Sequence, residues 1–427
     1  MRSLTLLVCS LALVACKDKK SEPAHEPPKP VAADAAAAPA IDAAVAAADA
    51  SAPSDTAAAP PAGDGVDFSA DAQRLFRVVG CGGEGPLPDD LAKFQKVVDK
   101  HCKTIAPDVE KFRAANLEIV KKWMAEHAPA DIPKTIVYPF GGGDLLSALI
   151  AFPDATEITT ISLELAGDPR RWMSLTPGDL DKSLAAFRKE IEWLVAYGSN
   201  TSVNLSAQQK NAVPGQVSSF LLAMHVAGYE PVGMRYFHID DTGKLIYVDQ
   251  AKIDADTSNT KPLSERWHNP AFAESYRNVE LTYRKVGETT LRTHRHIAWN
   301  LDNKHLQSEP GVLRHLEAKG KVTIIVKGAS YLLWRDEFTT MRKYILDHLA
   351  WMISDSTGIP PMYAKPAGME QETYGKFVQP GLDFAVGGKE DLDMRNAWKA
   401  SKGPAPFRFG YIDSNNNWHI MITRPKQ

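Results

Sequence analysis

Three consecutive glycines and an aspartate, residues 141–144, form the stretch that most resembles a piece of chemistry. Residues 136–164 follow the order of strand, glycine turn, short apolar helix, second strand and a closing acid, Glu164. This is the order of a nucleotide-binding βαβ unit. Gly141 and Gly143 match the first two positions of G-x-G-x-x-G, where backbone amides at a helix start receive a pyrophosphate.

Two residues argue against a nucleotide at this turn. The third glycine position holds Leu146. Asp144 falls in the first helical turn, where its carboxylate satisfies the amides and repels a phosphate. We therefore expect a nucleotide-like frame without nucleotide and without any other cofactor.

Two interpretations of the turn remain open: a structural turn capped by Asp144, or the mouth of a site for an uncharged or cationic small molecule. The candidate ligand-binding residues are Tyr138, Gly141, Gly142, Gly143, Asp144 and Glu164.

Two other pairs have the spacing of reactive groups. His294 and His296 alternate on one face of an expected strand, so they suit a metal only if a third ligand such as His238 converges. Without such a ligand they form a solvated face of a hairpin. Lys327 and Ser330 have the residue types of a serine–lysine nucleophile pair, but no nucleophile motif surrounds them. We therefore expect a lysine at a strand end and a serine in the next turn, and no metal site.

Two cysteines, Cys81 and Cys102, remain in the expected folded part. Phe94, Val98 and Cys102 recur at helical spacing, and Cys81 lies in the glycine-rich segment GCGGEG. We expect a disulfide between them, worth roughly 3 kcal/mol by restricting the unfolded chain. Two buried free thiols are the alternative.

The pattern of elements predicts an α/β fold: a three-layer mixed sheet with a Rossmann-like βαβ start, a helical N-terminal segment and added β-hairpins. We expect helical structure within residues 67–130 and the α/β part over 131–427. Strands are expected over 135–140, 157–164 and 321–328, and hairpins over 231–249, 279–300 and 405–424. Helices are expected over 176–198, 215–227 and 336–354. The formal net charge of −3 leaves no electrostatic footprint for nucleic acid.

The first sixteen residues resemble the signal of bacterial lipoproteins. Arg2 precedes a short apolar run, which is shorter than the roughly 20 residues of a membrane span and ends in LVAC, a lipobox. The resemblance implies a signal peptide over residues 1–15 and lipidation of Cys16. The partner of this end of the chain is then the lipid bilayer of the bacterial cell envelope. Lys17 is not the aspartate typical of inner-membrane retention, which favours the outer membrane.

Residues 16–66 have the composition of a disordered tether. They are rich in alanine and proline and contain no aromatic side chain before Phe68. The folded unit is expected over residues 67–427.

A second resemblance covers three segments, YPFGGGDLL, KGASYLLW and DSTGIPPMYA. They are similar to segments of an uncharacterised group of secreted bacterial α/β proteins and lipoproteins. The resemblance implies that their polar residues share one surface, and it implies no activity. The residues concerned are Tyr138, Pro139, Gly142, Asp144, Lys327, Ser330, Asp355, Gly358 and Pro360.

Together these patterns predict an anchored envelope lipoprotein that binds a small molecule or an envelope protein. The alternative is an envelope hydrolase acting on a glycan or another cell-wall substrate, which requires two convergent carboxylates. Exposed tryptophans such as Trp172, Trp267 and Trp334 would then offer a carbohydrate platform.

Overall fold

The structure is a computed structural model that describes residues 65–197, 213, 215–256, 274–380, 387–410 and 418–426. The expected signal peptide, the lipidated Cys16 and the tether as far as residue 64 lie outside these residues. Trp267 and the turn expected at residues 414–417 lie outside them too. Within the described part, no helix combines the length and the hydropathy of a membrane span.

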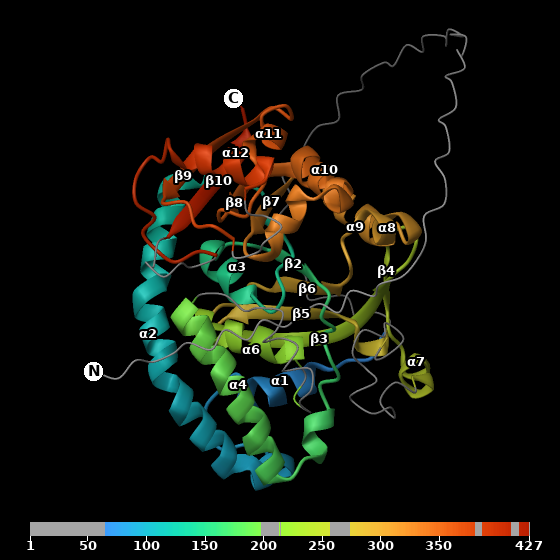
Figure 1. The fold of residues 1–427 in the computed structure, drawn as a ribbon. Coiled ribbons are helices and arrows are strands. Elements are labelled where there is room, and N and C mark those ends of the chain that lie inside the picture. The colour runs from blue at the N-terminus through green and yellow to red at the C-terminus, as the bar shows by residue number, and fades with distance from the viewer. Residues whose placement is uncertain are drawn as a thin grey trace, which may run out of the picture. The chain divides into compact units, whose positions relative to one another are not determined.

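A ten-stranded mixed sheet forms the centre of the described chain (Figure 1), in the order β4-β3-β5-β6-β2-β1-β7-β8-β10-β9. The strands are β1 Thr135–Pro139, β2 Glu157–Ser162, β3 Tyr229–Ile239, β4 Leu245–Tyr247, β5 Asn278–Lys285, β6 Arg292–Ala298, β7 Val322–Val326, β8 Leu349–Ser354, β9 Met369–Gly375 and β10 His419–Pro425.

The middle of the sheet is parallel, and both wings are antiparallel. Strands β6, β2, β1, β7 and β8 run parallel to their neighbours in this group. From β1 the chain continues to β2 on one side, whereas β7 pairs on the other side of β1. The strand order therefore reverses between β1 and β7, and in open α/β sheets ligands bind beyond the carboxyl ends of strands at such a reversal.

Helices cover both faces of the sheet and complete three layers. The apolar side chains of α1, α2, α3, α4 and α6 pack with Ile136 and Ile158 on one face. Those of α8, α9, α10 and α11 pack with Val137 and Ile324 on the other. Adjacent residues such as Ile136 and Val137 thus face opposite layers, as the two-residue period of a strand requires. The three-layer α/β fold expected from the sequence is confirmed.

The helices have the following bounds. The α-helices are α1 Ser69–Val78, α2 Gln95–His127, α3 Leu145–Ala151, α4 Pro177–Tyr197, α6 Gly215–Ala227, α7 Gln250–Ala255, α8 Asn303–Ser308, α9 Gly311–Glu317, α10 Thr339–His348, α11 Pro361–Ala364 and α12 Lys389–Trp398. The 3-10 helices are η1 Asp89–Phe94, η2 Arg171–Ser174, η5 Glu274–Tyr276, η6 Ala329–Trp334 and η7 Asp336–Phe338.

The first part of the described chain is helical and carries a disulfide. Cys102 of α2 is joined to Cys81 of the glycine-rich segment that follows α1, and the two Cα atoms are 5.4 Å apart. Cys81 has a φ of 60°, in the left-handed region that L-residues rarely adopt. The bond holds this segment against the 33-residue helix α2.

Two elements differ from the sequence expectation. The helix expected over residues 336–354 ends at His348, and the apolar run that follows it is strand β8. A short apolar run in a parallel sheet is buried on both faces, so its periodicity does not separate strand from helix. The hairpin expected over 405–424 is also wrong. Residues 405–410 form no strand, and β10 pairs with β8 and β9 instead.

Candidate functional site

A buried polar cluster lies where the order of the strands reverses. Asp144 follows β1 and begins α3, Lys327 follows β7, and Asp355 follows β8. These strands are neighbours and parallel, so their carboxyl ends meet at one edge of the sheet. The segments YPFGGGDLL, KGASYLLW and DSTGIPPMYA therefore converge in space.

Asp144 is the acceptor at the centre of this cluster. One carboxylate oxygen accepts hydrogen bonds from Tyr138 Oη at 2.9 Å and from Lys327 Nζ at 2.8 Å. The other accepts from the backbone N–H of Ser147 at 3.2 Å and so caps α3. Burial and the charge of Asp144 raise the pKa of Tyr138 well above its ordinary value, so the phenol remains a donor.

Lys327 links the cluster to helix α3. Its ammonium donates to Ser147 Oγ at 2.7 Å, and its side chain is 4 % exposed. The ammonium also lies 5.3 Å from the centre of the Phe409 ring. The carboxylate of Asp144 stabilises this buried ammonium, because an unpaired buried charge is far more costly.

Asp355 organises the second half of the cluster. Its carboxylate accepts from the backbone N–H groups of Gly328 at 2.9 Å and of Thr357 at 2.8 Å. Gly410 lies directly against it: a Cβ atom at Gly410 would come within 1.9 Å of an Asp355 oxygen, and its φ is +75°. The approach of residues 409–410 to the cluster thus depends on a glycine.

The cluster is interior, which corrects the expectation of a shared surface. Tyr138, Pro139, Asp144, Lys327, Ser330, Asp355, Gly358 and Pro360 are all buried, and only Gly142 is partly exposed. Ser330 Oγ lies 2.6 Å from Thr357 Oγ1, so the hydroxyl beside Lys327 Nζ is Ser147 and not Ser330. As expected, Lys327 follows the end of β7 and Ser330 lies in the next turn, η6, while Lys327 Nζ contacts Ser147.

The glycine turn itself is tight and partly strained. Phe140 has a φ of 61° and Gly142 a φ of 52°. Positive φ is rare for a bulky residue such as Phe140. Gly141 and Gly143 are buried beneath the turn. In the described structure no hydrogen bond or ion pair joins Glu164 to this turn, and its backbone carbonyl oxygen lies 2.7 Å from His296 Nε2. The structure therefore does not bring the Glu164 carboxylate together with Asp144.

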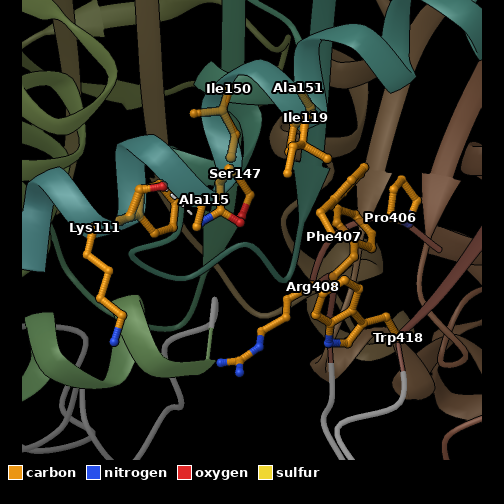
Figure 2. A pocket seen from close by; sticks show the side chains of 14 residues that line it. Lys111, Ala115, Ile119, Ser147, Ile150, Ala151, Pro406, Phe407, Arg408 and Trp418 are labelled. Atoms are coloured by element: carbon orange, nitrogen blue, oxygen red, sulfur yellow. Dashed lines mark hydrogen bonds between the residues drawn. The ribbon is translucent and has the colours of Figure 1, made fainter.

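A pocket of about 470 Å³ adjoins the cluster (Figure 2). Helix α2, helix α3 and the chain at 406–409 and 418 form its walls. Ser147 and Phe409 belong to both the pocket and the surroundings of Lys327. The lining residues are Lys111, Phe112, Ala115, Asn116, Ile119, Val120, Ser147, Ile150, Ala151, Pro406, Phe407, Arg408, Phe409 and Trp418. They are mostly apolar, and none is an aspartate or a glutamate.

The histidine pair is not a solvated face, contrary to expectation. His294 and His296 are both fully buried. They lie 2.9 and 3.1 Å from Thr160 Oγ1 and contact the ring of Phe220 on α6. Helix α6 covers this face of the hairpin, which the hairpin sequence alone does not reveal. Burial lowers the pKa of His296 to about 4, and it lowers the pKa of His294 well below its ordinary value. Among the described residues, no group of three metal-binding side chains is present.

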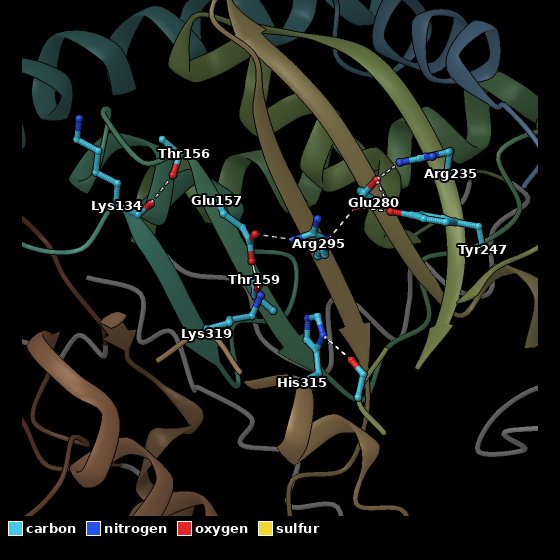
Figure 3. A network of polar contacts seen from close by, with 11 residues as sticks. Lys134, Thr156, Glu157, Thr159, Arg235, Tyr247, Glu280, Arg295, His315 and Lys319 are labelled. Carbon is cyan, nitrogen blue, oxygen red and sulfur yellow. Dashed lines mark hydrogen bonds and ion pairs between the residues drawn. The ribbon is translucent and has the colours of Figure 1, made fainter. Parts of the chain in front are cut away.

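A charged row crosses the opposite face of the sheet (Figure 3). Arg295 lies between Glu157 at 2.6 Å and Glu280 at 2.8 Å, and Glu280 also accepts from Arg235 at 2.7 Å. Lys319 pairs with Glu157 as well. Burial would raise the pKa of Glu157, but the charges of Lys319 and Arg295 outweigh it and lower the pKa to about 2. Glu157 and Glu280 both pair with cations of this row. We therefore interpret the row as stabilising the register of β2, β6, β5 and β3.

Sequence reasoning missed the residues that form the pocket. Ser147, Phe409 and Trp418 belong to no motif, and only the folded chain brings them together. The expected carbohydrate platform is wrong for its two described members, since Trp172 is fully buried and Trp334 is 6 % exposed.

Comparisons with protein-family models, with curated proteins and with solved structures found no match to this chain. The fold and the site define this chain as an α/β protein with a pocket beside a buried ion cluster.

Proposed function

We propose that this protein is a lipoprotein of the bacterial cell envelope, anchored at Cys16, whose α/β unit binds a small molecule in the pocket between α2 and α3. The observation that carries the proposal is the pocket itself. Its volume of about 470 Å³ falls in the usual range for small-molecule sites, about 300 to 1,000 Å³. It adjoins the carboxyl ends of β1 and β7, where ligands of open α/β sheets bind.

The lining favours binding over hydrolysis of a glycan. Glycosidases act with two carboxylates on either side of the scissile bond. None of the residues that line this pocket is an acid. Asp144 and Asp355 do converge, but both are buried and bound to donors of the protein itself. A small molecule fits a pocket of this volume better than a protein partner does.

The pocket is also a better candidate for the ligand site than the glycine turn. The Asp144 carboxylate, which the sequence places at the mouth of a cationic site, is occupied by Tyr138 and Lys327. The nearest lining group to this cluster is Ser147, on the pocket side of α3. The ligand site is thereby displaced from the turn to the outer side of α3.

Filling the pocket tests the binding proposal. We expect N-phenyl-naphthylamine, an uncharged apolar fluorophore, to bind the full chain, and Ile150→Trp to weaken this binding at least about tenfold, because the larger ring occupies the cavity. The measurement is a fluorescence titration. The control is Leu163→Trp, at an exposed position that does not line the pocket. Equal affinity in Ile150→Trp and in the unaltered chain would refute the proposed site.

The anchor is tested separately. Cys16→Ser removes the sulfur that would carry the diacylglyceryl group, and several acyl chains at about 0.8 kcal/mol per buried CH₂ hold a protein on a membrane. We expect the unaltered protein to sediment with the outer membrane of the expressing bacterium and the Cys16→Ser protein to be released from it. Labelled palmitate should enter only the former. Equal incorporation into both would contradict the lipoprotein assignment.

A further inference from the structure

The charged side chains that line the pocket are all cations. The titratable side chains that line it are Lys111 and Arg408, and its lining contains no carboxylate. Neither cation forms an ion pair with any residue in the described part of the chain. The pocket therefore has a positive rim over apolar walls.

Ser147 adds a donor at the inner end. A lysine ammonium has no lone pair and only donates, so Lys327 occupies an acceptor position of the Ser147 oxygen. No described residue accepts the hydroxyl hydrogen of Ser147. That hydrogen remains available to an acceptor inside the pocket, and the buried cation behind it polarises the hydroxyl.

Trp418 lines the pocket, but its indole nitrogen is covered. Its indole Nε1 is buried and makes no hydrogen bond with any described residue. Figure 2 shows the nitrogen-bearing ends of Lys111 and Arg408 and the Nε1 edge of Trp418 on the same, lower side of the pocket. Because this nitrogen is covered and not accessible from the pocket, the anion is assigned to the two cations alone.

The geometry points to an anionic ligand with an apolar body. Its carboxylate lies between Lys111 and Arg408. Its hydrocarbon part lies against the apolar walls, which include Ile119, Ile150 and Phe407. This inference rests on the proposed function and names the ligand class for the same pocket. It replaces the uncharged or cationic ligand expected at the glycine turn.

A pair of probes that differ only in charge tests the ligand class. Decanoate and decanol are titrated against N-phenyl-naphthylamine bound to the full chain. Charge-assisted hydrogen bonds are about twice as strong as neutral ones, so decanoate should displace the fluorophore at a concentration about tenfold lower than decanol. In the Lys111→Gln/Arg408→Gln variant, decanoate should lose about tenfold in affinity, whereas decanol should be unchanged.

Lys122→Gln is the matched control, since Lys122 is an exposed lysine of the same helix α2 and does not line the pocket. It should leave both affinities as they are. If decanoate and decanol bind equally and the double variant alters neither, the ligand class is wrong while the pocket stands. If decanoate is preferred and the double variant keeps that preference, the assignment of the two cations is wrong. If the fluorophore does not bind at all, the proposed function itself fails.

Discussion

Lys327→Met is expected to lower the free energy of unfolding by about 3 to 5 kcal/mol, the largest single-residue effect that we predict for the folded unit. Methionine has nearly the length of lysine but no charge. The change leaves the Asp144 carboxylate buried without its cation, at 2.8 Å from where Nζ had been. It also deprives Ser147 Oγ of its donor. The measurement is urea unfolding followed by circular dichroism.

Lys321→Met is the control for this prediction. Lys321 precedes β7 as Lys327 follows it. Lys321 is exposed, however, and among the described residues it donates only to the backbone carbonyl of Asp347. Its replacement should change stability by no more than about 0.5 kcal/mol. Adding Asp144→Asn to Lys327→Met should restore part of the loss, because the two sites are coupled through one ion pair. A loss below about 1 kcal/mol in Lys327→Met would show that the cluster contributes little.

The same ion pair raises the expected loss of stability in Asp144→Asn. If Asp144 were only the N-cap of α3, its replacement would cost at most about 1 kcal/mol. Because Asp144 also neutralises Lys327, the substitution strands a buried ammonium and the cost should be several-fold larger.

Acidification is expected to destabilise the protein steeply between pH 6.5 and pH 5. Burial lowers the pKa of His101 and His296 to about 4, and the same holds for His225 and His315, which are partly buried. Unfolded histidines titrate near 6.5. In this interval the unfolded chain therefore binds more protons than the folded chain, and stability falls as the pH falls.

The size of the loss of stability follows from the shift in the pKa of each histidine. A fully buried histidine whose pKa moves from 6.5 to about 4 contributes about 3 kcal/mol, present in full above pH 6.5 and lost as the pH approaches 4. Burial raises the pKa of Asp71 and Asp168, which opposes this trend nearer pH 4, so the measurement is best made between pH 7.5 and 5. Urea unfolding at several pH values in this range gives the slope.

His101→Gln should reduce that slope, because one neutral buried imidazole is removed. His101 is fully buried and lies 3.1 Å from the carbonyl oxygen of Val79. His305→Gln serves as the control at an exposed histidine, and it should reduce the slope less than His101→Gln does. A free energy of unfolding that stays constant from pH 7.5 to 5 would contradict the prediction.

Much of the fold was predictable because local signals agreed with the tertiary structure. Thr176 and Pro177 mark the start of α4, and Thr176 Oγ1 accepts from the Asp179 N–H at 3.2 Å as a capping residue does. The residues of the two hairpins alternate and are separated by turn residues, and both pairs of strands are antiparallel as expected. The strand β8 was mistaken for helix because a run buried on both faces has no informative period.

The candidate site was predictable only in part. The glycine turn and its aspartate stood out because their chemistry is local: Asp144 caps the helix that it begins. The partners of Asp144 could not be predicted. Lys327 lies far along the chain and reaches Asp144 only through the pairing of β1 with β7. Ser147 carries no sequence signal, since a hydroxyl is available to a ligand only when its neighbours leave it unsatisfied.

The sequence by itself determined the α/β class, the order of most elements and the cap at Asp144, since short-range periodicity and helix-end chemistry depend on residues close together in the chain. The tertiary structure alone decided that the polar motifs form an interior cluster, that His294 and His296 are buried beneath α6, and that a pocket lies beside α3. The physical reason is that burial and ion pairing depend on which residues meet in the folded chain. They arise when parallel strands bring their carboxyl ends to one edge and distant segments close over them.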